Sequence, residues 1–146
     1  MQSSKILAIA SDHAGFELKE AIKGWLQITG YEVIDYGTNS SLSMDYPDTI
    51  HPLANDISSG KMKRGIVICG SGIGVSIVAN HHKGVRCALC YEEELVVLSR
   101  QHNDANILAM GARFTSFEKA TKLITAFLNT EFEGGRHQTR VDKIDC

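Results

Sequence analysis

The segment from Cys69 to Gly74, Cys-Gly-Ser-Gly-Ile-Gly, places a thiol and three glycines just before an expected helix. Its glycines allow backbone N–H groups to turn toward an anion at the helix start, which suits a phosphate or an oxyanion formed in a reaction. The helix dipole and these N–H groups favour a thiolate at Cys69. Cys69 is therefore a candidate base or nucleophile. The alternative is a buried strand cysteine that acts as a small hydrophobic residue.

Three common glycine-loop functions do not fit this segment. The dinucleotide fingerprint needs a third glycine three residues after Gly72, and that position is Val75. No Lys-Ser or Lys-Thr follows the glycines, as a P-loop requires. A cysteine-based phosphatase loop would need an arginine six residues after Cys69, which is again Val75.

Other clusters could also carry chemistry. Asp12 and His13 follow the first expected strand, where Asp12 could equally be a helix N-cap. In the C-terminal tail, Arg136 and Arg140 would share one helix face and could bind one phosphate, whereas a solvated charged tail is the alternative. A further polar run spans Ser99-Arg100-Gln101-His102-Asn103-Asp104.

The pair Cys87 and Cys90 forms a C-x-x-C motif within an expected strand. Side chains alternate between the two faces of a strand, so a separation of three puts these thiols on opposite sides. The spacing therefore favours core packing over metal binding or redox activity.

Short apolar runs alternate with helix-length segments along the chain. We expect strands at 5–11, 31–36, 65–69, 85–90 and 105–110, and helices at 15–29, 48–59, 74–81, 92–102 and 116–129. This alternation predicts one α/β domain over residues 1–146: a three-layer, doubly wound, parallel five-stranded sheet. The expected strand order is flavodoxin-like, 2-1-3-4-5, with a Rossmann-like order as the alternative. Residues 131–146 form a tail that must dock at the site or a dimer interface, or fray.

Composition narrows the classes of protein. The chain has 146 residues, 43% hydrophobic and 22% charged, with a formal charge of -2, which argues against an obligate nucleic-acid binder. No apolar run is long enough to span a membrane, and the N-terminus shows no cleavage motif, so we expect a cytoplasmic protein. Its four cysteines are then expected to be free thiols.

The expected topology separates His102 from Cys69. The carboxyl ends of strands 1 and 3 flank the crevice where such folds bind ligands, and Cys69 lies there. His102 instead precedes strand 5, at the amino end of the sheet. If His102 is catalytic, a two-fold partner must supply it, which predicts a homodimer, or possibly a tetramer, with sites shared between chains.

Together these residues resemble the type B ribose-5-phosphate isomerases, in the family that also includes galactose-6-phosphate and allose-6-phosphate isomerases. The resemblance covers essentially the whole chain in five blocks: Ser11-Asp12-His13-Ala14-Gly15-Phe16, Asp45-Tyr46-Pro47, Cys69-Gly70-Ser71-Gly72-Ile73-Gly74, Ser99-Arg100-Gln101-His102-Asn103-Asp104 and Glu133-Gly134-Gly135-Arg136-His137. It implies an aldose-ketose isomerase that acts on a small phosphorylated sugar and needs no metal or organic cofactor.

The resemblance also implies a role for each matching residue. Cys69 would move a proton between C1 and C2 of ribose 5-phosphate, and His102 would assist ring opening, with Ser71 and Asp12 completing the catalytic set. Substrate would be bound by His13, Tyr46, Gly70, Ser71, Gly72, Ile73, Gly74, Asn103, Arg113, Arg136 and Arg140. Ser71 replaces the threonine of many relatives and keeps its hydroxyl. Other branches have a glutamate base where this chain has Val75.

Three other functions remain open on the residues alone. The enzyme could act on a 6-phosphohexose, because pentose and hexose phosphates differ by one carbon. A non-catalytic sugar-phosphate sensor would use the glycine loop and the arginines only for binding. A cysteine hydrolase would form a covalent intermediate at Cys69.

Overall fold

One parallel sheet of five strands organises the computed structural model, which describes residues 5–145. The strands are β1 (Ile6–Ser11), β2 (Glu32–Asp35), β3 (Gly65–Cys69), β4 (Cys87–Leu89) and β5 (Ile107–Gly111). The helical segments are η2 (His13–Gly15), α1 (Phe16–Ile28), α2 (Pro47–Ser58), α3 (Ile73–Ala79), α4 (Glu93–Asn103), α5 (Phe117–Asn129) and α6 (Arg136–Asp142). The expected α/β class, the five strands and the five main helices are confirmed, and the tail is helical.

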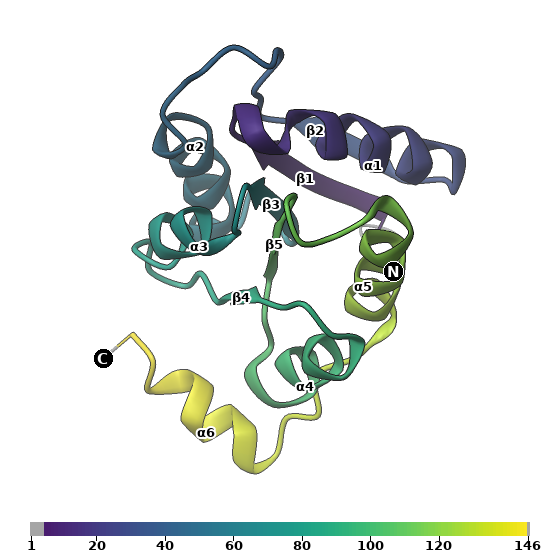
Figure 1. Cartoon of the computed structure of the whole chain (residues 1–146). Coiled ribbons are helices and arrows are strands. Elements are labelled where there is room, and N and C mark those ends of the chain that lie inside the picture. Colours follow the sequence, from purple (N-terminus) through teal and green to yellow (C-terminus); the bar gives the residue numbers. More distant parts are fainter. Residues whose placement is uncertain (1–4, 146) are drawn as a thin grey trace.

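Helices cover both faces of the sheet, as the three-layer prediction requires (Figure 1). Alternate residues of β1 enter different cores, because strand side chains point to opposite faces. Leu7 and Ile9 pack in the core under α1, α4 and α5. Ala8 and Ala10 belong to the core under α2 and α3, where their small side chains let those helices approach the sheet. Within residues 5–145, no helix has both the length and the apolar character needed to cross a membrane.

The predicted order of the last two strands is wrong. The sheet runs β2-β1-β3-β5-β4, so β5 pairs with β3 and β4 lies at the edge. Burial explains this arrangement: every residue of β5 is buried, whereas the three residues of β4 are only partly buried. A short, half-exposed strand suits a sheet edge, and a fully apolar strand suits the centre.

The changed order leaves the crevice where it was expected. After β1 the chain continues into α1 on one face, and after β3 it continues into α3 on the other face. The carboxyl ends of these neighbouring strands therefore flank a topological switch point. Ser11 is paired with Ile68, and Cys69 is paired with Gly111, so the three central strands end at nearly the same level.

A buried lysine ties α1 to the end of β2. The Lys19 side chain is fully buried, and its Nζ lies 2.7 Å from both an Asp35 and a Glu20 carboxylate oxygen. Lys23 also contacts Asp35, at 2.9 Å. Desolvation alone would raise the pKa of Asp35, but bonds from Lys19, Lys23 and the Gly37 N–H outweigh it and hold that pKa below its usual value. The network therefore stabilises the fold while Asp35 is charged.

Replacing Asp35 by asparagine should lower the free energy of unfolding at pH 7 by about 3 kcal/mol, because it leaves Lys19 buried beside only the more exposed Glu20. Asp35 has a lowered pKa in the folded state, so its stabilisation is complete above the unfolded value near 3.8 and is lost as pH falls through the lower folded value. The difference between Asp35→Asn and wild type should therefore shrink below that pH. Urea unfolding across this range measures it.

Glu92→Gln provides the matched control for that experiment. Glu92 pairs with Lys119 at 3.4 Å, and its side chain is 70% exposed. Removing this exposed pair should cost less than about 1 kcal/mol. Equal losses in the two variants would contradict a special role for the buried lysine.

Candidate active site

The turn after β1 holds Asp12 and His13 against the end of β3. Asp12 is buried, and its Oδ1 accepts a hydrogen bond from the Gly15 N–H at 3.1 Å. The N-cap interpretation of Asp12 is therefore correct for one carboxylate oxygen. A Cβ atom at Gly15 would lie 2.8 Å from the Ile68 carbonyl oxygen, so this close approach of the turn to β3 requires glycine.

The glycine loop after β3 directs a backbone donor at the thiol. Cys69 is 6% exposed, and the Gly72 N–H donates to its Sγ at 3.2 Å. Gly72 has φ +80°, and a Cβ there would lie 2.8 Å from the Met110 carbonyl carbon, so both the conformation and the close packing require glycine. Hydrogen bonds to sulfur favour the anionic form. Ser71 Oγ accepts the Ile73 N–H at 3.1 Å and so sits at the start of α3.

Two larger side chains lie over glycines of this loop. A Cβ added to Gly70 would meet the Arg113 guanidinium at 3.0 Å, and one added to Gly74 would meet the Tyr46 ring at 2.8 Å. The Thr49 hydroxyl, which donates to the Ser11 carbonyl at 2.9 Å, attaches the start of α2 to the end of β1. The arginine and the tyrosine thereby reach one crevice from distant parts of the sequence.

His13 is oriented by the loop before α2. The Met44 N–H donates to His13 Nδ1 at 3.2 Å. An acceptor nitrogen carries no proton, so neutral His13 carries its proton on Nε2. His13 can therefore donate a hydrogen bond from Nε2.

These parts line one open pocket of about 490 Å³. Its lining residues are Asp12, His13, Ala14, Tyr46, Cys69, Gly70, Ser71, Ile73, Gly74, Ile77 and Arg113. Nine of the residues singled out from the sequence thus lie together, and Gly72 contributes through its bond to Cys69. Ala14 and Ile77 were not anticipated.

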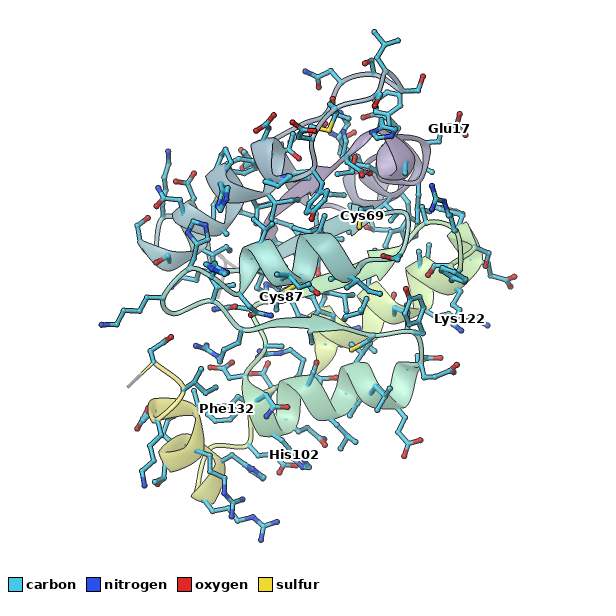
Figure 2. The ribbon with its side chains drawn as sticks, turned by 60° about the vertical axis from the view of Figure 1, so that its left-hand side comes forward. Glu17, Cys69, Cys87, His102, Lys122 and Phe132 are labelled. Carbon is cyan, nitrogen blue, oxygen red and sulfur yellow. The ribbon has the colours of Figure 1, made fainter. Side chains whose placement is uncertain are left out.

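Four anticipated residues lie elsewhere: His102, Asn103, Arg136 and Arg140. Figure 2 shows the side chains of Cys69 and His102 well separated, with His102 beside the C-terminal helix. His102 is on the last turn of α4, and its ring stacks on that of His137 with 4.3 Å between centroids. Partial desolvation, then His102 and Arg136, lower the pKa of His137, whereas Glu133 opposes them. His137 is therefore mainly neutral at pH 7.

Tyr91 supports the glycine loop and was not identified from the sequence. Its hydroxyl donates to the Ser71 carbonyl, and its ring meets Phe114 edge to face at 6.0 Å. Desolvation, with a smaller contribution from Cys69, raises the pKa of Tyr91, so the hydroxyl keeps its proton at neutral pH. No sequence pattern marks this residue, because the contact joins the turn after β4 to a loop twenty residues earlier.

The other described cysteines are structural, as their spacing predicted. Cys87 packs with the core on the α2 and α3 face, and Cys90 with the core on the opposite face. Burial raises the pKa of both thiols. All three described cysteines are free, and Cys146 lies outside the described residues.

The fold and the pocket define a doubly wound α/β enzyme whose crevice combines a thiol that accepts the Gly72 N–H, a carboxylate and an arginine, which suits an anionic substrate. Residues 7–144 match the model of the ribose/galactose isomerase family. Ribose-5-phosphate isomerase B of Escherichia coli is 46% identical over 140 residues, which cover 96% of this chain and 94% of the relative. This chain therefore belongs to the ribose/galactose isomerase family.

Solved structures agree with this assignment. A ribose-5-phosphate isomerase B from Clostridium thermocellum is 48% identical, with a TM-score of 0.94 over 96% of this chain and 95% of the other. The enzyme from Mycoplasma genitalium, solved with bound ribulose 5-phosphate, is 41% identical, with a TM-score of 0.91 over 95% of this chain and 93% of the other.

Iodoacetamide should alkylate Cys69 before Cys87 and Cys90. Cys69 lines the pocket and receives a backbone N–H, whereas burial raises the pKa of the other two thiols and keeps them protonated. Time-resolved peptide mass spectrometry at pH 7 separates the sites, with the Cys146 peptide scored independently. Faster labelling of Cys87 or Cys90 in folded protein would contradict the assignment of the reactive thiol.

Proposed function

We propose that this protein interconverts D-ribose 5-phosphate and D-ribulose 5-phosphate through an enediolate, as a cytoplasmic enzyme of the non-oxidative pentose phosphate pathway. The observation that carries the proposal is the Gly72 N–H directed at Cys69 Sγ, at 3.2 Å, beside Asp12, Tyr46 and Arg113. An aldose-ketose isomerase needs a base and fixed donors for an oxyanion, and we assign these roles to Cys69 and to the backbone N–H groups of the glycine loop.

The chemical steps follow from that equipment. The Cys69 thiolate removes the proton from C2 of the open-chain aldose, and the C–H electron pair forms the C1–C2 double bond as negative charge develops on O1. Backbone N–H groups of the Gly70 to Gly74 loop stabilise this charge. The thiol then returns the proton to C1, and the hydroxyl proton on O2 passes to O1, so that O2 becomes the carbonyl oxygen of the ketose. No net oxidation occurs, so no redox partner is needed.

Binding of the phosphate uses groups remote from the reacting carbons. In the pocket, His13 can donate from Nε2, and the Arg113 guanidinium lies over Gly70. We assign Arg136 and Arg140 of α6 to the same phosphate, with Tyr46 and Asn103 on the sugar. Binding energy from a remote phosphate holds the carbons in register with the base.

We further propose that two chains share each site. His102, Asn103, Arg136 and Arg140 do not line the pocket that contains Cys69, so a two-fold partner must bring them to it. Exposed apolar side chains at the pocket support such an interface: Ile73 and Ile77, one turn apart on α3, are 53% and 59% exposed, and Phe114 is 66% exposed. A homodimer is the smallest assembly that completes the site, and a tetramer would contain two such pairs.

Two relatives support a pentose substrate, since one is named ribose-5-phosphate isomerase B and another was solved with ribulose 5-phosphate. The family description also includes galactose isomerases. A 6-phosphohexose, allose or galactose 6-phosphate, is therefore the second candidate substrate. It would use the same proton transfer in a deeper pocket.

Purified protein should convert ribose 5-phosphate to the ketose, and Cys69→Ala should lower kcat by at least about 100-fold, because it removes the acid-base group. Cys90→Ala is the matched control: it removes a buried thiol outside the pocket and should retain wild-type kcat. A coupled ketose assay measures both, with allose 6-phosphate and galactose 6-phosphate in parallel.

The outcomes of that assay separate the alternatives. Turnover of a hexose phosphate alone would keep the mechanism and change the substrate. Binding of all three sugars with no turnover would overturn the isomerase assignment and favour a sensor. A trapped thioester or thiophosphate at Cys69 would favour a hydrolase.

Mixing two inactive variants tests whether the site is shared. Cys69→Ala and His102→Asn chains should each be nearly inactive, whereas refolding them together in equal amounts should restore about one quarter of wild-type activity. Random pairing makes half of the dimers mixed, and one of the two sites in each mixed dimer is then intact.

A mixture of the Cys69→Ala chain with wild type provides the reference for subunit exchange. No recovery from the two variants, despite exchange shown by differential mass labels, would mean that each chain uses its own His102. That result would overturn the shared-site proposal.

A further inference from the structure

His102, Glu133 and His137 form a cluster of metal-binding side chains outside the Cys69 pocket. One donor atom of each lies within 4.8 Å of the other two. Two imidazoles and one carboxylate are a ligand set that binds zinc and related transition metals in proteins and leaves a position for water. The cluster joins the end of α4 to the segment that enters α6.

Contacts with neighbouring elements hold the three groups together. The rings of His102 and His137 stack nearly parallel, at 14° with 4.3 Å between centroids, so one ring must turn about its Cβ–Cγ bond before both lone pairs point at a single ion. His137 Nε2 lies 3.6 Å from Glu133 Oε1. The Glu133 N–H donates to the Gln101 carbonyl at 3.1 Å, which attaches the segment before α6 to α4. Zinc bonds of about 2.0–2.2 Å place tetrahedral donors about 3.4 Å apart, so the three donors are close enough for rotation of the side chains to bring them to one ion.

We propose that this cluster is a transition-metal site that inhibits the enzyme reversibly. The metal is Zn²⁺ or another late first-row dication, held by one nitrogen of each histidine and by the Glu133 carboxylate. The inhibitory part rests on the proposed function, because a metal-bound His102 has lost the lone pair with which it would assist ring opening. The ion takes no part in isomerisation and is not a cofactor.

The charges around the cluster and the types of its ligands determine which cations bind to it. Arg136 and Arg140 lie on the same helix as His137, and their positive charges oppose any dication, whereas Glu133 offsets them in part. Mg²⁺ and Ca²⁺ prefer oxygen ligands and gain little from imidazole, so they should not bind. Zn²⁺, Ni²⁺ and Co²⁺ bind imidazole well and should.

Calorimetric titration of the full-length protein with zinc chloride tests the site without measuring activity. We expect one Zn²⁺ per chain, and Glu133→Gln should weaken binding by at least about 10-fold, the smallest loss seen even for outer partners of metal ligands. His82→Asn is the matched control, because His82 and His51 form another histidine pair, with ring nitrogens 2.8 Å apart. Unchanged binding by Glu133→Gln, or loss on His82→Asn, would overturn the site.

Cobalt distinguishes this cluster from the catalytic thiol. Co²⁺ bound by His102, Glu133 and His137 has only nitrogen and oxygen ligands and should give no sulfur-to-cobalt charge-transfer band. Such a band, lost in Cys69→Ser, would show that the metal binds Cys69 and would overturn the proposal.

Turnover completes the test. Zinc should inhibit ribose 5-phosphate conversion by wild type over the concentrations at which calorimetry shows binding, and EDTA should reverse it. Glu133→Gln should turn over normally without metal and should need at least about 10-fold more zinc for inhibition. Stoichiometric binding without inhibition would overturn the regulatory role. A protein that binds zinc but converts no sugar would refute the proposed function alone, since calorimetry reports the site independently.

Discussion

The site depends on the contact between two backbones, the glycine loop after β3 and the end of β5. A Cβ at Gly72 would lie 3.0 Å from the Gly111 nitrogen, and a Cβ at Gly111 would lie 2.6 Å from the Ser71 carbonyl oxygen. Cys69 and Gly111 are paired in the sheet, so this contact occurs where both strands end. It keeps the loop close enough for the Gly72 N–H to face the Cys69 sulfur. A strand that ended in a larger residue would push the loop away.

The same contact explains why β5, and not β4, is the neighbour of β3. Any residue with a Cβ in the place of Gly111 would collide with the loop, and β5 provides a glycine at this level. The glycine at the end of β5 is visible in the sequence. The alternation of strands and helices does not reveal which strand lies beside β3, because the connections allow either β4 or β5 there. The apolar sequence of β5, Ile-Leu-Ala-Met-Gly, was the other signal for a central strand, and all five of its residues are buried. The predicted order failed because it relied on connectivity and gave no weight to the residues at the strand ends.

The elements themselves and most of the pocket could be predicted, because short apolar runs and capping glycines are local signals. Gly30 and Gly60, which follow α1 and α2, have φ +100° and +84°. Asp12, His13 and Cys69 were placed correctly since parallel strands end at one edge of a sheet. Tyr91 and Glu133 could not be found in this way. Tyr91 contacts the Ser71 carbonyl, and Glu133 contacts His137. Both contacts form only after the segment that follows β4 and the C-terminal tail have packed.

The region around Cys69 and the region around His102 and His137 differ in electrostatic character. Around Cys69, the Gly72 N–H is directed at the sulfur, and a backbone donor keeps its partial positive charge at every pH. Around His102 and His137, partial desolvation, then His102 and the two arginines of α6, lower the pKa of His137, whereas Glu133 raises it. The first region therefore suits an anionic intermediate at a fixed position. The second contains two stacked imidazoles, and these are the groups that the proposed transition metal would bind.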